Sequence, residues 1–180
     1  MEASVTVITP TLPERSQLLE RCARSVIKQT VFCLHEIFSD RIGEGPQALR
    51  NALAWSATTE WLLPLDDDDE LDPTCVQMLL ENSEDADIVY PWCRMEGRTD
   101  NWVPNKLFEP GALFKQNFIP VTALIRRDLF LMLGGYQKSA MEDWLFWQWA
   151  YLHGATFKCV PEVLWTYHHH EGQAFQGQAA

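Results

Sequence analysis

The sequence contains no long hydrophobic run. No uninterrupted apolar stretch among its 180 residues approaches the roughly 18 residues that a membrane-spanning helix needs. The first residues, Met1 to Ser4, lack the basic and apolar regions that begin a signal peptide. We therefore expect no transmembrane segment and a soluble protein.

Spaced cysteine pairs are also missing. The 5 cysteines are an odd number and include no Cys-x-x-Cys pair, so they fit neither a paired disulfide framework nor a zinc ribbon. Free thiols are typical of proteins in a reducing compartment. This pattern predicts a cytoplasmic protein.

Positive charge is scarce. The chain has 14 lysines and arginines against 25 aspartates and glutamates, which gives a formal net charge of -11. This excess of negative charge opposes binding to polyphosphate backbones and to anionic lipid surfaces. Bulk nucleic acid is therefore disfavoured as a partner, whereas a single nucleotide remains compatible with this charge.

The composition is otherwise that of a folded protein. Hydrophobic residues make up 47% of the chain and charged residues 22%, close to the averages of globular domains. The length suits one hydrophobic core. We expect one domain over residues 1–172 and a flexible tail over residues 173–180.

The hydrophobic pattern of the first half alternates between strands and helices. Strands are predicted at residues 4–9, 35–39, 60–65 and 87–91, with helices at 15–29, at 48–53 and from 72–73 onward. This alternation predicts an α/β fold with a mostly parallel sheet and helices on both faces. In such a sheet the loops at the carboxyl ends of the strands form the binding crevice.

The second half has a looser pattern. After residue 92 it predicts a strand at residues 121–125, a short helix from Asp128, a helix at 143–153 that Gly154 ends, and two short strands at 156–160 and 163–167.

Four adjacent aspartates, Asp66 to Asp69, follow the apolar strand at residues 60–65. Carboxylates this close repel one another, so they need either full solvation or a cation. One interpretation is a solvated acidic turn before the next helix. The other is a site for Mg²⁺ or Mn²⁺, which prefer oxygen ligands, with phosphate oxygens of a substrate completing the coordination.

Several motifs resemble, in their order along the chain, those of family 2 glycosyltransferases of the GT-A fold. They are Val5–Thr11, Arg50-Asn51, Asp66-x-Asp68-Asp69-x-x-x-Pro73, Phe118–Arg127, Gly134-Gly135-Tyr136, Glu142-Asp143-Trp144 and Val160–Leu164. The acidic segment matches the family's D-x-D-D-x-x-x-P spacing. The resemblance covers residues 4–170 and implies a nucleotide-sugar-binding half at residues 4–91 and an acceptor and catalytic-base half at residues 92–172.

This resemblance implies a metal-dependent transfer of a sugar from a nucleotide-sugar donor to an acceptor hydroxyl. Asp68 would bind a Mn²⁺ or Mg²⁺ ion that bridges the donor's diphosphate, and Asp66 would contact the ribose or the metal shell. Asp69 would orient the site or the donor sugar. Asp67 matches no family role, and we expect it to face solvent.

The other donor-binding residues that the resemblance implies lie at the ends of the first two predicted strands and in the second helix. They are Thr9, Pro10, Thr11, Asp40, Arg50 and Asn51. After the second strand the chain departs from the family, because only Asp40 remains of the usual pair of aspartates. A UDP-sugar is the favoured donor on the basis of its frequency in the family alone.

The pair Glu142-Asp143 begins a helix, where carboxylates are common as capping groups. By resemblance, Asp143 is the catalytic base that takes the proton of the acceptor hydroxyl, so that the anomeric carbon inverts. Glu142 would bind the acceptor or brace the loop. His170 matches a Tyr-x-x-His position of the family and is a candidate metal ligand, with a surface or a packed histidine as the equal alternative.

Two other functions use a similar site. A nucleotide-sugar hydrolase or nucleotidyltransferase would also need an acidic loop that holds a cation, although the Gly-rich, Lys-bearing phosphate loop of many such enzymes is missing. A noncatalytic sugar- or nucleotide-binding domain could keep the fold without turnover. The joint presence of Asp66, Asp68 and Asp143 argues against that last alternative.

Overall fold

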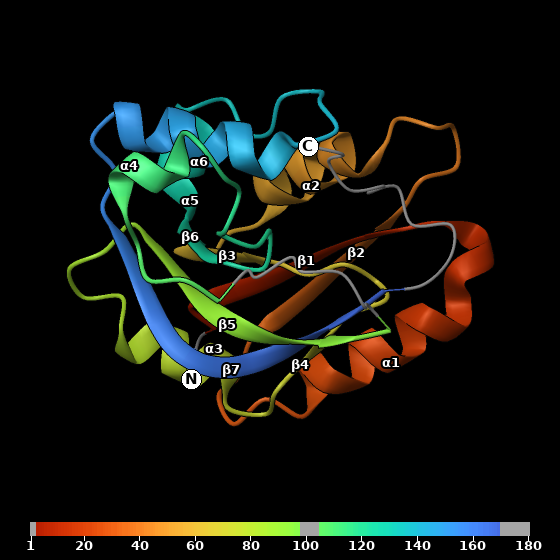
Figure 1. The fold of residues 1–180 in the computed structure, drawn as a ribbon. Coiled ribbons are helices and arrows are strands. Elements are labelled where there is room, and N and C mark those ends of the chain that lie inside the picture. Colours follow the sequence, from red (N-terminus) through yellow and green to blue (C-terminus); the bar gives the residue numbers. More distant parts are fainter. Residues whose placement is uncertain (1–2, 98–104, 170–180) are drawn as a thin grey trace.

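A seven-stranded sheet runs through the described residues, 3–97 and 105–169, of this computed structural model (Figure 1). The strand order is β2-β1-β3-β6-β5-β7-β4. The strands are β1 (Val5–Thr11), β2 (Leu34–Ser39), β3 (Trp61–Pro64), β4 (Glu70–Leu71), β5 (Ile88–Glu96), β6 (Leu124–Arg126) and β7 (Phe157–His168).

The strand directions are mixed, with one direction dominant. β1 pairs in parallel with β2 and β3, and β5 pairs in parallel with β7. β6 is antiparallel to both β3 and β5, and β4 is antiparallel to β7. Strands β1, β2, β3, β5 and β7 therefore all run the same way, which confirms the predicted mostly parallel sheet.

Helices cover both faces of this sheet. They are α1 (Ser16–Ile27), α2 (Pro46–Ser56), α3 (Cys75–Glu81), α4 (Pro110–Leu113), α5 (Arg127–Met132) and α6 (Glu142–Leu152), with a 3₁₀ turn η1 at Pro13–Arg15. Helices α2, α5 and α6 pack on one face, and α1 and α3 on the other (Figure 1). This arrangement is the two-sided α/β architecture that the sequence predicts.

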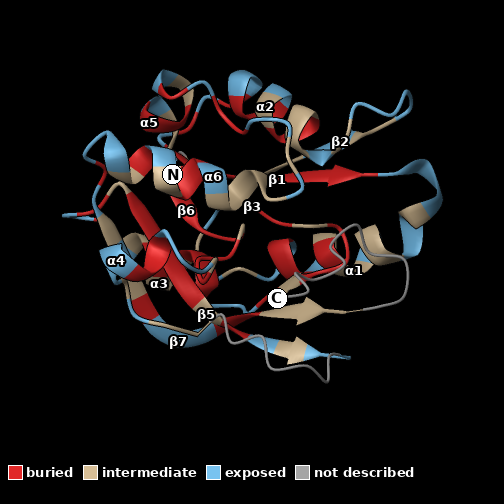
Figure 2. Cartoon of the chain, turned by 45° about the horizontal axis from the view of Figure 1, so that its top comes forward, coloured by how far each residue is buried: buried red, intermediate tan, exposed pale blue. Residues whose placement is uncertain are grey.

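The burial of β3 shows why both faces are apolar. All four of its residues are buried, and they alternate between two hydrophobic clusters: Leu62 belongs to the cluster under α2, α5 and α6, whereas Trp61 and Leu63 belong to the cluster under α1 and α3. Successive side chains of a strand point to opposite faces, so a strand covered on both sides needs an unbroken apolar run. Figure 2 shows the buried central strands and the exposed outer sides of the helices.

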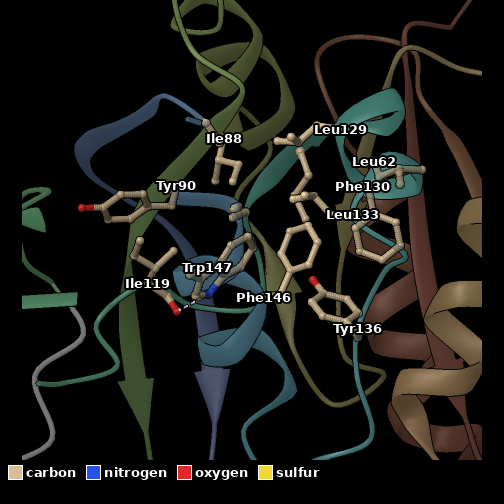
Figure 3. Packing of buried hydrophobic residues seen from close by; sticks show 14 of the residues in the cluster. Leu62, Ile88, Tyr90, Ile119, Leu129, Phe130, Leu133, Tyr136, Phe146 and Trp147 are labelled. Atoms are coloured by element: carbon tan, nitrogen blue, oxygen red, sulfur yellow. Dashed lines mark hydrogen bonds between the residues drawn. The ribbon is translucent and has the colours of Figure 1, made fainter. Parts of the chain in front are cut away.

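Aromatic side chains fill the first of these clusters (Figure 3). The Phe146 ring lies 5.0 Å from that of Phe130 and 5.2 Å from that of Tyr136, between centroids. Trp147 is fully buried, and its Nε1 donates a hydrogen bond of 3.1 Å to the carbonyl of Ile119. Helix α6 is therefore anchored next to its first turn, which carries Glu142 and Asp143.

Several predicted elements differ from the structure. The two strands predicted at residues 156–160 and 163–167 are one strand, β7, in which Pro161 and Glu162 have no partner on β5. Pro161 has no N–H to give to the ladder, so the strand is interrupted there but continues. The helix predicted from residues 72–73 begins at Cys75, because the carboxylate of Asp72 first closes a turn on Thr74. β4 and α4, of 2 and 4 residues, are too short to show a hydrophobic periodicity in the sequence, so neither was predicted.

Within the part of the chain that the structure describes, no helix is long and apolar enough to cross a bilayer. All five cysteines are free thiols. The tail predicted at residues 173–180 lies outside the described residues.

Candidate active site

Three carboxylates come together where β3 ends. Oxygen atoms of Asp66, Asp68 and Asp69 all lie within 4.8 Å of one another. Asp68 and Asp69 are buried, whereas Asp66 is half-buried. Three carboxylate oxygens are hard ligands of the kind that Mn²⁺ and Mg²⁺ prefer, so these residues fit the divalent metal that the sequence predicts.

Asp69 shows the electrostatic cost of this cluster. Burial, followed by the neighbouring charges of Asp66 and Asp68, raises the pKa of Asp69 well above its usual range. Its Oδ1 accepts a hydrogen bond of 2.9 Å from the backbone N–H of His168, at the end of β7. A cation between these carboxylates would offset their repulsion.

Asp67 is buried, with 2% of its surface exposed, so the expectation that it faces solvent is wrong. Its Oδ2 accepts a hydrogen bond of 2.5 Å from the hydroxyl of Thr11, and its Oδ1 lies 3.0 Å from a guanidinium nitrogen of Arg15. Burial raises the pKa of Asp67. The segment leaves β3 beside the end of β1, and this pairing turns Asp67 inward.

The acidic segment also contacts two arginines, Arg15 at the end of η1 and Arg21 in the middle of α1. Arg15 donates to Asp68 Oδ2 at 2.6 Å, and Arg21 donates to the backbone carbonyl of Asp68 at 2.5 Å. Arg21 also lies 3.2 Å from Glu70. Neither arginine was predicted from the sequence, because no pattern in this segment distinguishes an arginine that binds the acidic segment from one that faces solvent.

Arg50 of α2 joins the two acidic motifs. It is buried, with 3% exposed, and its Nη2 forms an ion pair with Asp66 while its Nη1 lies 2.8 Å from Glu142. Burial opposes the charge of Arg50, but the carboxylate of Asp66 and the neighbouring Tyr136 and Glu142 outweigh it, so the pKa of Arg50 is raised. This pairing was not foreseen from the sequence.

Asn51, the next residue, holds the segment before α6. Its side-chain amide donates to the carbonyl of Tyr136 and accepts from the N–H of Tyr136, each at 2.9 Å. Gly135 permits this approach, since a Cβ there would lie 2.5 Å from Asn51 Oδ1. The Asn51 amide therefore connects α2 to the second half of the chain.

Asp143 lies in the first turn of α6 and is half-buried. Its two carboxylate oxygens accept from Nδ2 of Asn117 at 3.3 and 3.2 Å, and Oδ1 also accepts from the N–H of Trp144 at 2.7 Å. Burial raises the pKa of Asp143 to about 6, although the Asn117 hydrogen bond opposes this shift. A carboxylate with such a pKa is suited to act as a general base near neutral pH.

Asn117 is the partner of Asp143 that sequence reasoning missed. It belongs to the connection between α4 and β6, where no pattern indicates a functional side chain. Its Oδ1 is buried and accepts no hydrogen bond from the described residues.

The remaining predicted donor residues are placed near the ends of β1 and β2. Pro10 lies within β1. Thr9 is fully buried, and its hydroxyl lies 2.9 Å from Nε2 of His35. Asp40 accepts backbone hydrogen bonds from four residues of the following loop, Ile42, Gly43, Glu44 and Gly45, and these bonds lower its pKa.

His170 lies outside the described residues. The histidine two positions before it, His168, has its Nε2 at 3.0 Å from Glu70.

The family model described as "Glycosyl transferase family 2" matches residues 35–143 of this chain. This stretch, more than half of the sequence, contains the acidic segment after β3 and ends at Asp143. The chain belongs to glycosyl transferase family 2. No curated protein matches the sequence.

Solved structures show the same fold. S. aureus TarS 1-349 in complex with UDP-GlcNAc matches with a TM-score of 0.80 and 16% identity, over 98% of this chain and 62% of that chain. The mannosyltransferase PcManGT from Pyrobaculum calidifontis, in complex with GDP-Man and Mn²⁺, matches with a TM-score of 0.68 and 14% identity, over 93% of this chain and 57% of that chain. This family 2 chain has the predicted GT-A fold, and it spans about three fifths of the length of these structures.

Proposed function

We propose that this family 2 chain is a metal-dependent, inverting glycosyltransferase that moves a sugar from a nucleotide-sugar donor to an acceptor hydroxyl. One observation carries the proposal: Arg50 links a carboxylate cluster suited to a divalent cation with the motif that holds a half-buried base, Asp143. A glycosyl transfer needs these two chemistries side by side, because the leaving group gains negative charge while the acceptor loses a proton.

Asp66, Asp68 and Asp69 would hold the cation, Mn²⁺ or Mg²⁺. When bound, such an ion neutralises the charge that develops on a departing diphosphate. The presence of Mn²⁺ with GDP-Man in PcManGT supports a metal of this kind, and the UDP-GlcNAc in TarS supports a UDP-sugar as the favoured donor. Thr9, Pro10 and Thr11 would line the nucleotide at the end of β1 mainly through backbone groups, because both threonine hydroxyls already have partners.

Asp143 would take the proton from the acceptor hydroxyl. Asn117 and the N–H of Trp144 hold its carboxylate in one orientation, which is what a positioned base requires. Direct displacement with one base on the acceptor side predicts that an α-linked donor gives a β-linked product.

The free thiols of the cysteines agree with the prediction of a cytoplasmic location.

Turnover of UDP-GlcNAc and GDP-Man, followed as release of UDP or GDP, tests the proposal with and without a panel of acceptor alcohols. We expect release that depends on Mn²⁺ or Mg²⁺ and increases with a suitable acceptor. Release at the same rate without any acceptor would identify a hydrolase instead. Metal-dependent binding of a donor without release of UDP or GDP would identify a noncatalytic binding domain.

The anomeric configuration of the product tests the mechanism separately. Proton NMR coupling constants distinguish an α from a β linkage. A retained α linkage would remove Asp143 from the role of base and leave the fold assignment intact.

A further inference from the structure

Arg50 contacts both halves of the proposed site with one side chain. It lies 16 residues before Asp66 and 92 residues before Glu142, and each of its two terminal nitrogens is used for one of these carboxylates. Its side chain is 4% exposed, against 34% for Asp66 and 15% for Glu142. Solvent therefore has little access to the guanidinium, and the carboxylates are its charge partners.

The guanidinium geometry makes this bridge specific. An arginine side chain is a rigid planar fork whose nitrogens point in fixed directions, whereas a lysine offers a single point charge on a flexible stem. Two carboxylates bound to the same fork are held at a fixed separation. Any movement of Asp66 therefore changes the position that is favourable for Glu142.

Glu142 is the residue before Asp143 in the first turn of α6. Fixing the Glu142 side chain therefore fixes the start of the helix that carries the proposed base. The neighbouring Asn51 supports the same connection independently, because its amide binds both backbone groups of Tyr136, which lies in the segment leading into α6. Two consecutive residues of α2 thus bind the start of α6 and the chain that precedes it.

We propose that Arg50 is a positioning residue that couples the carboxylates after β3 to the catalytic base, rather than a group that binds the donor itself. A cation and a diphosphate at Asp66 change the charge that Arg50 faces, and Arg50 transmits this change to Glu142 and the first turn of α6. This inference rests on the proposed function for the role of Asp143, but the contact that it concerns is tested without turnover.

The first experiment is hydrogen exchange at the start of α6. In Arg50→Lys, which keeps the charge and loses the fork, we expect the amides of residues 145–147, which donate within the helix, to exchange about tenfold faster than in the wild type. Arg127→Lys is the matched control, because Arg127 also binds α2, at the carbonyls of Ala54 and Trp55, but lies outside the proposed site. Equal exchange of these amides in Arg50→Lys and in the wild type overturns the proposal.

The second experiment is a double-mutant cycle on the binding of UDP in the presence of Mn²⁺, measured by calorimetry. Glu142→Gln leaves Arg50 with Asp66 as its charged partner, so Arg50 competes more strongly with the cation, and we expect UDP binding to weaken about threefold. In the Arg50→Lys background, the same Glu142→Gln change should have less than half that effect on a logarithmic scale. Equal effects in both backgrounds overturn the coupling.

These two experiments also separate this inference from the proposed function. If the wild type binds no UDP with Mn²⁺ while Arg50→Lys accelerates exchange in α6, then the donor chemistry is wrong and the positioning contact stands. If UDP binds normally and exchange in α6 does not change, the donor site of the proposed function stands and Arg50 is not a positioning residue.

Discussion

Arg50 and Glu142 lie 92 residues apart in the chain and form an ion pair with a nitrogen–oxygen distance of 2.8 Å. The same guanidinium pairs with Asp66. The buried charge of Arg50 therefore lies between the carboxylates after β3 and helix α6, which carries the proposed base. Buried ion pairs are costly to break on one side only, because the remaining charge loses its partner. The ion pairs of Arg50 therefore hold the acidic segment after β3 and the Glu142-Asp143 motif in a fixed relative position in the folded protein.

The carboxylate cluster predicts metal-dependent binding. Asp68→Asn should weaken the binding of UDP in the presence of Mn²⁺ by about tenfold or more, because it removes one anionic ligand of a hard cation. Mn²⁺ should also raise the melting temperature of the wild type, and a chelator should reverse this rise. Asp85→Asn, at an exposed position away from the cluster, is the control and should bind UDP like the wild type. Binding of UDP that is indifferent to both chelator and Asp68→Asn would rule out the metal site.

The pKa of Asp143, about 6, predicts the pH dependence of activity. A general base must be ionised, so kcat/KM should rise with pH up to about 6 and level off above it. Asn117→Ala removes a hydrogen bond that favours the ionised form, and the rise should therefore move to higher pH. Initial rates between pH 4.5 and 8.5 measure both profiles. Identical profiles for the two proteins would show that Asn117 does not act on the base.

The same pKa predicts a stability effect of the opposite sign to the activity effect. The pKa of Asp143 is about 6 in the folded protein against a reference value of 3.8, so its stabilising contribution is complete below pH 4 and is lost as the pH rises through 6. Asp143→Asn imitates the neutral form and should raise the free energy of unfolding at pH 7.5 by about 1 kcal/mol. The gain is this small because solvent screens part of the cost of ionising a half-buried group. Urea denaturation at pH 7.5 and at pH 4 tests this, because the gain should disappear at the lower pH.

The burial of Asp67 predicts a structural rather than a ligand-binding role. Asp67→Ala should lower the free energy of unfolding by about 1 to 3 kcal/mol, because it removes the carboxylate that accepts from the hydroxyl of Thr11 and leaves Arg15 with one of its two carboxylates. The affinity for UDP with Mn²⁺ should fall far less than in Asp68→Asn. A loss of affinity without any loss of stability would instead place Asp67 in the ligand site.

The contact between Gly135 and Asn51 predicts a difference between two neighbouring glycines. Gly134 and Gly135 both have positive φ, of 80° and 71°. A Cβ at Gly134 would meet no atom within 4 Å, whereas one at Gly135 would lie 2.5 Å from Asn51 Oδ1. Gly134→Ala should cost about 1 kcal/mol of stability from backbone strain alone, and Gly135→Ala clearly more, because it also displaces Asn51. Equal losses of stability in thermal denaturation would mean that the Asn51 side chain moves away from the new Cβ at position 135 without lowering stability.

The main elements of the fold were predictable because their signals are local. The apolar run at Trp61–Pro64 and the helical spacing in Ser16–Ile27 each lie within one element, and strand–helix alternation then leaves a parallel sheet as the natural arrangement. The irregularities were not predictable. Whether Pro161 ends a strand or only interrupts it depends on β5, which pairs with β7 on both sides of that proline.

The candidate site divides in the same way. The sequence by itself determined that Asp66, Asp68 and Asp69 lie close together, because they are chain neighbours at the end of a buried strand, and that Glu142 and Asp143 begin a helix. Only the tertiary structure decided that Asp67 turns inward and that Asn117 holds Asp143. It also decided that one arginine joins both acidic motifs, since that contact exists only when α2 and α6 pack on the same face of the sheet. Contacts between residues far apart in the chain follow from packing, and packing has no signature within a single segment.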